Sequence, residues 1–151
     1  MMKKIICLLT ICLLCFFSIA CNDLSLNENV KTEFKIHEQA NIDHYRIILS
    51  KQETFTTYQN TPSSNGQYLL LTFNIQNNSN STATIQEDSF YLEVDGHTYN
   101  PIDFQQVTIA SNEDEQITII YDVPDNDHFS LLFYSGVVSN NIAFDIDLNT
   151  K

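Results

Sequence analysis

The chain has 151 residues, of which 43% are hydrophobic and 17% charged, and this composition fits a single globular domain. With only 3 Gly and 3 Pro, it is neither collagen-like nor a Gly- or Pro-rich low-complexity protein. Seven Lys and Arg against 19 Asp and Glu give a formal charge of −12. Between Lys51 and Lys151 there are fourteen acidic residues and no Lys or Arg, which excludes nucleic-acid binding because such binding needs cations that neutralise phosphates.

Residues 1–20 have the pattern of an export signal. Lys3 and Lys4 precede an apolar run over residues 5–17 that is broken by a single threonine. Thirteen residues suit the apolar core of a signal peptide but fall short of the roughly 20 that a membrane-spanning helix needs. The sequence therefore predicts a signal peptide over 1–20.

The residues that follow this run are Ser18, Ile19, Ala20 and Cys21. They resemble the lipobox of bacterial lipoprotein precursors, in which a small residue precedes a cysteine that receives a diacylglyceryl group before cleavage. The resemblance implies lipidation of Cys21 and a protein anchored in the cell membrane on its extracellular side, and two acyl chains give stable attachment. Ser18 and Ala20 also satisfy the small-x-small rule of ordinary cleavage, so a freely secreted protein and an uncleaved anchor remain alternatives.

Cleavage before Cys21 changes the length and the formal charge of the mature chain. Loss of 20 residues, including two lysines, leaves 131 residues with five basic and 19 acidic side chains, a formal charge of −14. Three of the four cysteines leave with the signal, so neither a disulfide nor a thiolate zinc site is expected. Residues 21–40 are predicted to form a lipid-proximal tether, with a possible short first strand over 30–36, and residues 41–151 to form the folded domain.

From residue 42 onward, apolar and polar residues alternate with the two-residue period of β-strands. A first strand contains Tyr45, Ile47 and Leu49, and residues 52–66 are predicted to be a loop. The strongest strand spans 67–76, and four apolar side chains share its inward face: Leu69, Leu71, Phe73 and Ile75. An Asn- and Ser-rich turn at 77–81 and a short strand at 82–86 follow.

Asp95-Gly96 is a sequence typical of a type I′ hairpin turn. Closure by two residues pairs Leu92 with Tyr99 and Val94 with His97. Further strands are predicted over 107–110, 116–123, 129–134 and 142–148, and no stretch of ten or more residues has a helical period. This pattern predicts an all-β, immunoglobulin-like antiparallel β-sandwich of about 7–9 strands.

Three segments carry a resemblance to a known family: YLLLTFNIQNNS at 68–79, FYLEVDGHTY at 90–99 and ITIIYDVP at 117–124. Together they resemble the extracellular immunoglobulin-like, immunoprotein-type domain of unknown function found in Gram-positive bacterial lipoproteins. The resemblance covers roughly residues 40–150 and implies a surface-exposed, lipid-tethered β-sandwich of undefined activity. Residues 111–114 (SNED) stand where the family often has Pro-Gly.

Sequence motifs for catalysis are absent. There is no G-x-S-x-G, phosphate loop or dinucleotide fingerprint. His37-Glu38 begins a zinc-protease motif, but Asn41 stands where the second histidine is needed. Four histidines are scattered along the chain and are expected to be exposed or at the rim of the sandwich: His37, His44, His97 and His128.

Two acidic clusters were weighed as calcium sites, one at 113–115 and one formed by Asp122, Asp125 and Asp127. They flank the predicted strand 116–123 and therefore lie roughly 25 Å apart, too far to share an ion. The candidate metal ligands are Asp122, Asp125 and Asp127, with calcium as the ion. The alternative is that these residues are solvated and end strands. No other cofactor is expected.

Four aromatic residues at strand ends or in loops are candidate contacts for a partner: Tyr58, Tyr91, Tyr121 and Phe129. Amphipathic rings often bind carbohydrate or peptide, although Tyr is also common within sheets. The sequence thus predicts a lipid-anchored, non-enzymatic binding or accessory module for an unknown extracellular protein or wall polymer. A calcium-stabilised adhesion domain is one alternative. A hydrolase that uses paired carboxylates or a dispersed Ser/His/Asp triad is another, and it requires an Asp or Glu that is buried in a cleft and whose pKa is raised.

Overall fold

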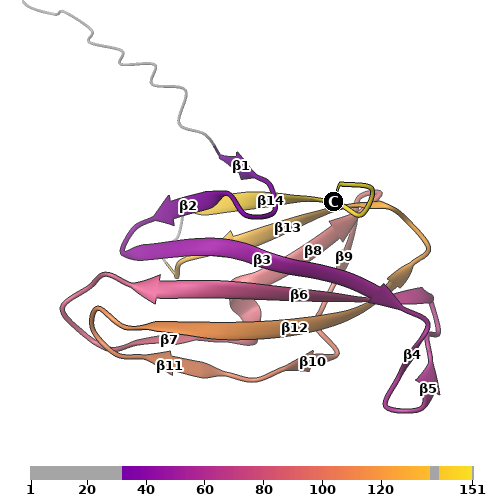
Figure 1. Ribbon diagram of the computed structural model, residues 1–151, viewed down its shortest axis with the longest axis horizontal. Helices are drawn as coiled ribbons and strands as arrows, with labels where there is room; N and C mark the ends of the chain where they lie inside the picture. Colours follow the sequence, from indigo (N-terminus) through magenta and orange to yellow (C-terminus); the bar gives the residue numbers. More distant parts are fainter. Residues whose placement is uncertain (1–31, 137–139, 151) are drawn as a thin grey trace, which may run out of the picture. The chain divides into compact units, whose positions relative to one another are not determined.

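The computed structural model describes residues 32–136 and 140–150. Two five-stranded sheets face each other across a shared core, and two short strand pairs accompany them (Figure 1). The predicted all-β sandwich is therefore confirmed. The predicted signal peptide and Cys21 lie outside the described residues.

The first sheet has the strand order β1-β14-β13-β8-β9. Its strands are β1 (Glu33–Phe34), β14 (Asn141–Asp147), β13 (His128–Tyr134), β8 (Phe90–Val94) and β9 (His97–Tyr99). β1 and β14 run parallel, whereas every other pair in this sheet is antiparallel. A single 3-10 turn, η1 (Glu87–Ser89), leads directly into β8.

The second sheet has the order β10-β12-β6-β3-β2 and is antiparallel. Its strands are β10 (Asp103–Phe104), β12 (Asp114–Pro124), β6 (Gly66–Asn77), β3 (Tyr45–Phe55) and β2 (Gln39–Ile42). The small pairs are β7 (Ala83–Ile85) with β11 (Val107–Ile109), and β4 (Thr57–Tyr58) with β5 (Thr61–Pro62).

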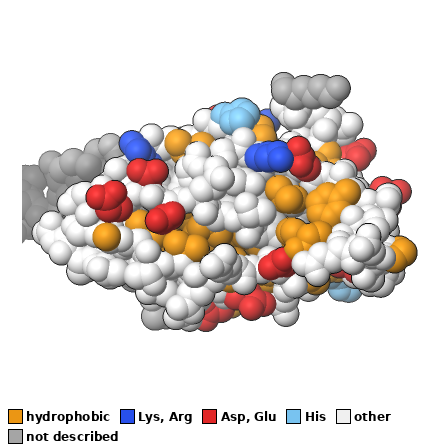
Figure 2. All heavy atoms as spheres, turned by 60° about the horizontal axis from the view of Figure 1, so that its bottom comes forward, with side chains coloured by type: hydrophobic (Ala, Val, Ile, Leu, Met, Phe, Trp, Pro, Cys, Tyr) orange, Lys and Arg blue, Asp and Glu red, His pale blue; other side chains and the backbone are white. Residues whose placement is uncertain are grey.

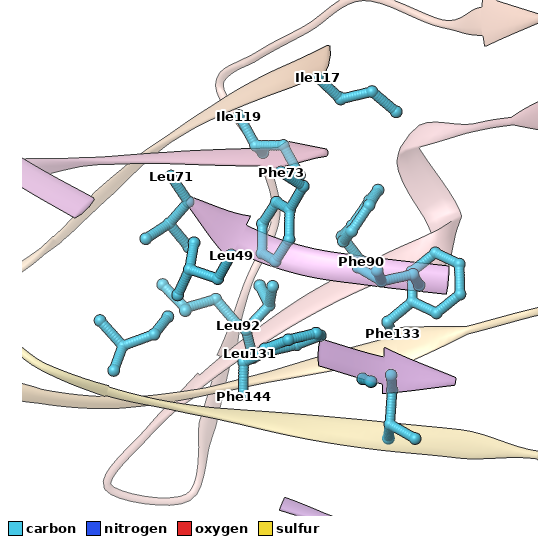
Figure 3. Packing of buried hydrophobic residues seen from close by; sticks show 14 of the residues in the cluster. Leu49, Leu71, Phe73, Phe90, Leu92, Ile117, Ile119, Leu131, Phe133 and Phe144 are labelled. Carbon is cyan, nitrogen blue, oxygen red and sulfur yellow. The ribbon is translucent and has the colours of Figure 1, made fainter. Parts of the chain in front are cut away.

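The core lies between the two sheets and is built from the alternating apolar residues of their inner faces (Figure 3). The four residues predicted to face inward from β6 are fully buried. Phe73 of this set packs edge-on against Phe144 of the opposite sheet, with ring centroids 5.2 Å apart, and also contacts Phe90 at 5.5 Å. Close packing of such rings adds to the hydrophobic stabilisation of the interior.

The predicted hairpin between β8 and β9 is confirmed. Leu92 pairs with Tyr99 and Val94 with His97, the register expected from a two-residue turn. Asp95 and Gly96 have φ angles of 49° and 78°, so both adopt the left-handed backbone that a type I′ turn requires.

The predicted loop at 52–66 is wrong over much of its length, because β3 continues to Phe55 and β4 and β5 form a hairpin within the remainder. The pairing of β3 with β6 shifts between Leu49 and Lys51, so Ser50 is an extra residue in a β-bulge. Before the bulge, alternate residues up to Leu49 are buried; after it, Gln52 pairs with Leu71, an inward residue. Before the bulge the odd-numbered residues face the core, and after it the even-numbered ones do. A sequence pattern that assumes one uninterrupted alternation therefore misses the second half of the strand.

The predicted domain boundary at residue 41 is too late. Phe34 of β1 and Ala40 of β2 are buried members of the core, so residues 33–40 belong to the sandwich rather than to a tether. The possible first strand over 30–36 corresponds to β1, whereas β2 was not predicted, because four residues carry too little pattern; their partners β14 and β3 provide the pairing.

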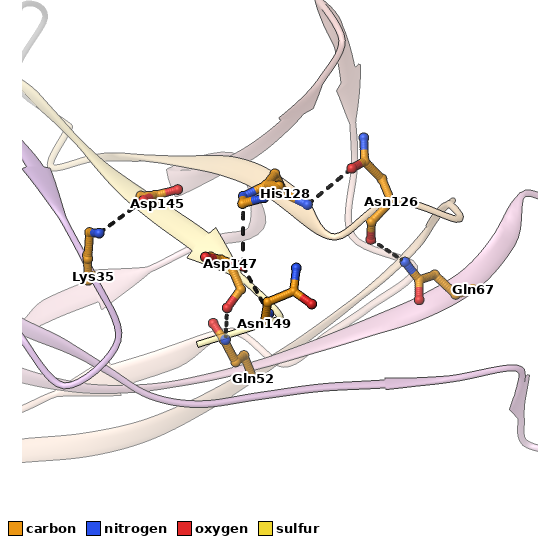
Figure 4. Close-up of polar contacts among 8 residues, drawn as sticks. All are labelled: Lys35, Gln52, Gln67, Asn126, His128, Asp145, Asp147 and Asn149. Atoms are coloured by element: carbon orange, nitrogen blue, oxygen red, sulfur yellow. Dashed lines mark hydrogen bonds and ion pairs between the residues drawn. The ribbon is translucent and has the colours of Figure 1, made fainter. Parts of the chain in front are cut away.

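Polar side chains link the two sheets at one end of the sandwich (Figure 4). The Gln52 amide on β3 donates to the carbonyl of Asp147 on β14 at 2.8 Å, and the Gln67 amide on β6 donates to the carbonyl of Asn126 at 2.7 Å. These bonds satisfy backbone acceptors where the strands end.

Candidate functional site

The outer face of the first sheet carries apolar side chains that the core does not use. Tyr91 of β8 and Leu132 of β13 stand opposite each other in the antiparallel register and are half-buried. They alternate with the buried Leu92 and Leu131, which point into the core. Tyr134, two residues beyond Leu132, shares its face.

One hollow lies over this face, and a second lies beside it at the η1 turn. One has a volume of about 420 Å³ and is lined by Asp88, Tyr91, Glu93, Thr98, Leu132 and Tyr134. The other, of about 370 Å³, is lined by Gln86, Glu87, Asp88, Phe90, Tyr91, Asn100, Pro101 and Gln106. The two hollows share Asp88 and Tyr91 in their linings, and we name them together the β8–β13 groove.

The two tyrosines of the groove support each other. Their rings meet edge to face, with centroids 5.3 Å apart and planes at 87°. Edge-to-face pairs of this kind are favourable beyond their buried area, and they hold both rings in place. Tyr91 therefore presents a positioned, half-exposed ring at the point where the two hollows meet.

The charged groups that line the groove are all carboxylates: Glu87, Asp88 and Glu93. The η1 turn, closed by a bond from the Ser89 N–H to the Gln86 carbonyl at 3.1 Å, holds the first two beside β8. All three are exposed, and none forms an ion pair within the described part of the chain. Both hollows thus carry negative charge that no Lys, Arg or His side chain among residues 32–136 and 140–150 pairs with.

Of the four aromatic residues predicted as partner contacts, two are wrong. Tyr121 is fully buried and Phe129 is 4% exposed, so both belong to the core. Tyr121 pairs with Leu69 and Phe129 with Ile146, which are themselves inward residues. Neither is able to touch a partner without unfolding of the sandwich.

Tyr91 and Tyr58 are half-buried, so each offers part of its ring to solvent. Tyr58 lies in the β4–β5 hairpin against Phe55 and Tyr68, at centroid distances of 5.9 and 5.8 Å, and its hydroxyl donates to Asp103. Figure 2 shows hydrophobic side chains gathered in patches among acidic ones on the side that it displays. Tyr58 is engaged by neighbours on the protein itself, which makes Tyr91 the better candidate for a partner contact.

The structure does not bring Asp122, Asp125 and Asp127 together around a point. Instead the Asp122 carboxylate accepts hydrogen bonds from the hydroxyl of Ser64 at 2.6 Å and from the hydroxyl of Ser63 at 2.5 Å. Burial alone would raise the pKa of Asp122, but these bonds and those from the backbone of Ser64 and Asn65 hold it below its usual range. Among residues 32–136 and 140–150, no three His, Cys, Asp or Glu side chains form a group that could hold a metal ion.

The arrangement that a paired-carboxylate hydrolase requires is not found in the described ranges. No Asp or Glu there is buried. The carboxyl groups whose pKa is displaced all have it lowered: by the hydrogen bond from Ser135 at Asp43, by the backbone N–H of Asn149 at Asp147, and in the way given above at Asp122. A general acid needs the opposite shift.

The histidines follow the expectation from sequence. His37, His97 and His128 are exposed, and His44 is half-buried with its ring 4.1 Å from that of Tyr45. None of them lines the β8–β13 groove. As for membrane crossing, the described segments contain no helix with the length and apolar character to traverse a bilayer.

The fold places this chain among the β-sandwich proteins. No family model matches the sequence, and no curated protein matches it either. Likeness appears among solved structures, at 13–16% sequence identity for the three given below, and it therefore concerns the fold alone.

One similar structure is the ycdA protein of Bacillus subtilis, described as a "putative lipoprotein", with a TM-score of 0.64 and 13% identity; the match covers 75% of this chain but only 39% of that one. The yjhA protein of Bacillus subtilis has a TM-score of 0.60 and 14% identity, over 76% of this chain and 99% of the other. The secreted protein MPT63 of Mycobacterium tuberculosis has a TM-score of 0.56 and 16% identity, over 78% and 97%.

Proposed function

We propose that this protein is a lipid-anchored, surface-exposed and non-enzymatic binding module whose contact surface is the β8–β13 groove. The observation that carries the proposal is the half-exposed Tyr91–Tyr134 pair, which lies in a groove on an outer sheet face and is not covered by any described element. The export signal and Cys21 support a location at the extracellular side of the membrane.

The chemistry of the groove favours binding over catalysis. Its lining contains no histidine, cysteine or serine that could act as a nucleophile or as its base. Tyrosine, by contrast, supplies a large contact area at a low cost in conformational entropy, and aromatic residues are enriched at the energetic centres of protein interfaces. A rigid sheet behind the rings keeps this contact area in one arrangement.

Cross-linking in intact cells tests the contact surface. Full-length wild-type chain, Tyr91→Ala and Gln116→Ala are each expressed, cross-linked and recovered, and the attached proteins and polymers are compared. Gln116 is an exposed residue of the opposite sheet and is the matched control. We expect the wild type and Gln116→Ala to recover the same partner and Tyr91→Ala to lose most of it; equal recovery by Tyr91→Ala would remove the groove from the proposal.

The anchor is tested separately. With Cys21→Ala, we expect the protein to leave the membrane fraction, because the thiol that accepts the diacylglyceryl group is gone. Retention of this variant in membranes would favour an uncleaved signal anchor instead. This outcome bears on the attachment alone and leaves the groove as it is.

A further inference from the structure

The carboxylates of the outer sheet faces differ in whether the protein itself supplies a cation. Asp145 of β14 lies 3.9 Å from the Lys35 ammonium, and Glu53 lies 2.9 Å from that of Lys51. The described Lys and Arg residues are Lys35, Arg46 and Lys51, and none of them lines the β8–β13 groove. The groove is therefore a negatively charged surface to which the described part of the chain supplies no cation.

A hollow on the other sheet serves as a comparison, because its lining contains both acidic and basic side chains. It has a volume of about 550 Å³ on the outer face of the β12-β6-β3 sheet, and Arg46 lines it together with Asp114 and Glu115. No aromatic side chain is among its lining residues. The β8–β13 groove thus differs from it in two independent ways, by the tyrosine pair and by the missing cation.

Aromatic rings and carboxylates in one hollow are complementary to a cation on a long apolar stem. An ammonium or guanidinium group is attracted both to carboxylates and to the face of an aromatic ring. The methylene groups of Lys or Arg pack well against apolar surface while their charge remains near water. Leu132 and the tyrosine rings supply that apolar surface, and Asp88 and Glu93 supply the opposite charge in the same hollow.

We infer that the β8–β13 groove binds an extended polypeptide segment bearing Lys or Arg at alternate positions. The inference rests on the proposed function, because it names the partner of the same surface. Two hollows flank Tyr91, and alternate side chains of an extended chain lie about 7 Å apart on one side, so successive cations can enter neighbouring hollows. A single small cation would occupy only one of them.

Peptide binding to the full-length chain in detergent tests this inference. The probe is a fluorescent peptide of alternating Lys and Ser, and its control is the same peptide with every lysine acetylated, which removes the charge and keeps the stem. Anisotropy titration gives the affinity, and we expect the acetylated peptide to bind at least about tenfold more weakly. Failure of the unmodified peptide to bind would overturn the inference.

Three variants separate recognition by the groove from general attraction to an acidic protein. Glu93→Gln removes one charge from the groove, and Glu115→Gln removes one charge from the opposite sheet. We expect Glu93→Gln to weaken binding about fivefold and Glu115→Gln by less than about twofold. Tyr91→Leu should weaken binding about fivefold or more, with an unchanged melting temperature as the check on folding. Equal losses with the two charge variants would overturn the inference, since they would show attraction by net charge alone.

The outcome for the cationic partner is distinguishable from that for the proposed function. If the partner recovered from cells depends on Tyr91 but the lysine peptide does not compete with it, the binding surface stands and the cationic partner is refuted. If an amine-bearing wall polymer competes and the lysine peptide does not, the polypeptide assignment is likewise refuted.

Discussion

Tyr121 provides a sharp test of the described core. It is one of the largest fully buried side chains, and its hydroxyl has no hydrogen-bond partner among the described residues. A hydroxyl that is transferred from water to such a site without a partner costs about 1–3 kcal/mol. Tyr121→Phe keeps the ring and removes this cost, so we expect the free energy of unfolding to rise by about 1 kcal/mol. For a domain of this size, the rise corresponds to roughly 4 °C in melting temperature.

Urea denaturation followed by circular dichroism measures the effect. Tyr91→Phe is the matched control, because it removes a hydroxyl from a half-exposed ring and should change the free energy of unfolding by less than about 0.5 kcal/mol. Tyr121→Ala should lower it by about 3–5 kcal/mol, since it leaves a cavity behind the ring. If Tyr121→Phe were instead to destabilise the protein by about 1 kcal/mol or more, the hydroxyl must be hydrogen-bonded, for example to a buried water, and the reasoning fails.

The same burial predicts a dependence on alkaline pH. Burial, with a smaller contribution from the Glu87 carboxylate, raises the pKa of Tyr121 far above its usual value of 10.0. Above about pH 10, the unfolded chain ionises this phenol while the folded chain keeps it neutral. The free energy of unfolding therefore falls as the pH rises above about 10 and is unaffected by this group at lower pH. Tyr121→Phe should therefore be less sensitive than the wild type to unfolding above pH 10, as measured by melting temperature against pH.

Three further predictions concern the residues beside Tyr121 at the end of β12 and the candidate metal ligands. Asp122→Ala should lower the free energy of unfolding by about 1–2 kcal/mol through loss of the bonds from Ser63 and Ser64. Because the pKa of Asp122 is lowered, this difference from the wild type should shrink as the pH falls below about 4, a trend that thermal melts at pH 3 and pH 7 can check. Gly66→Ala should cost about 2 kcal/mol in a urea titration, since φ is +147° and a Cβ would lie 2.6 Å from the backbone nitrogen of Asp125. Millimolar calcium should leave the melting curve unchanged, and a clear rise in melting temperature would restore the calcium hypothesis.

The strands that could be predicted from sequence are those whose pattern is local. In residues 67–76, Leu, Leu, Phe and Ile recur at every second position from 69 to 75, and the Asp95-Gly96 turn specifies the register of its own hairpin, so both are predictable from adjacent residues alone. The second half of β3 could not be recognised in this way, because the bulge at Ser50 shifts the phase and no local signal marks it. Short strands such as β1 exist through pairing with a partner more than a hundred residues away.

The two-residue period of a strand also shows which candidate aromatic residues face the core and which face outward. Tyr121 is in phase with Ile117 and Ile119, and both are buried, so its burial follows from the spacing. Tyr91 is out of phase with Phe90 and Leu92 and points away from the core. Tyr121 was a candidate because it lies near a strand end, but the face on which a strand residue lies is decided by the two-residue period.

The acidic residues differ in whether the fold supplies a partner for their carboxylates, and the local sequence does not predict this. Asp122 was a candidate ligand by virtue of its neighbours in sequence, yet its carboxylate is occupied by a turn 57 to 59 residues earlier in the chain, a contact that no local pattern encodes. Glu87, Asp88 and Glu93 are brought together around Tyr91 by the η1 turn and by β8, and no cation of the described chain meets them. A carboxylate that the fold has already satisfied contributes to stability, whereas one left exposed beside a positioned aromatic ring is available to a partner. This distinction is the reason why we propose the residues of the β8–β13 groove, rather than Asp122, as the contact surface.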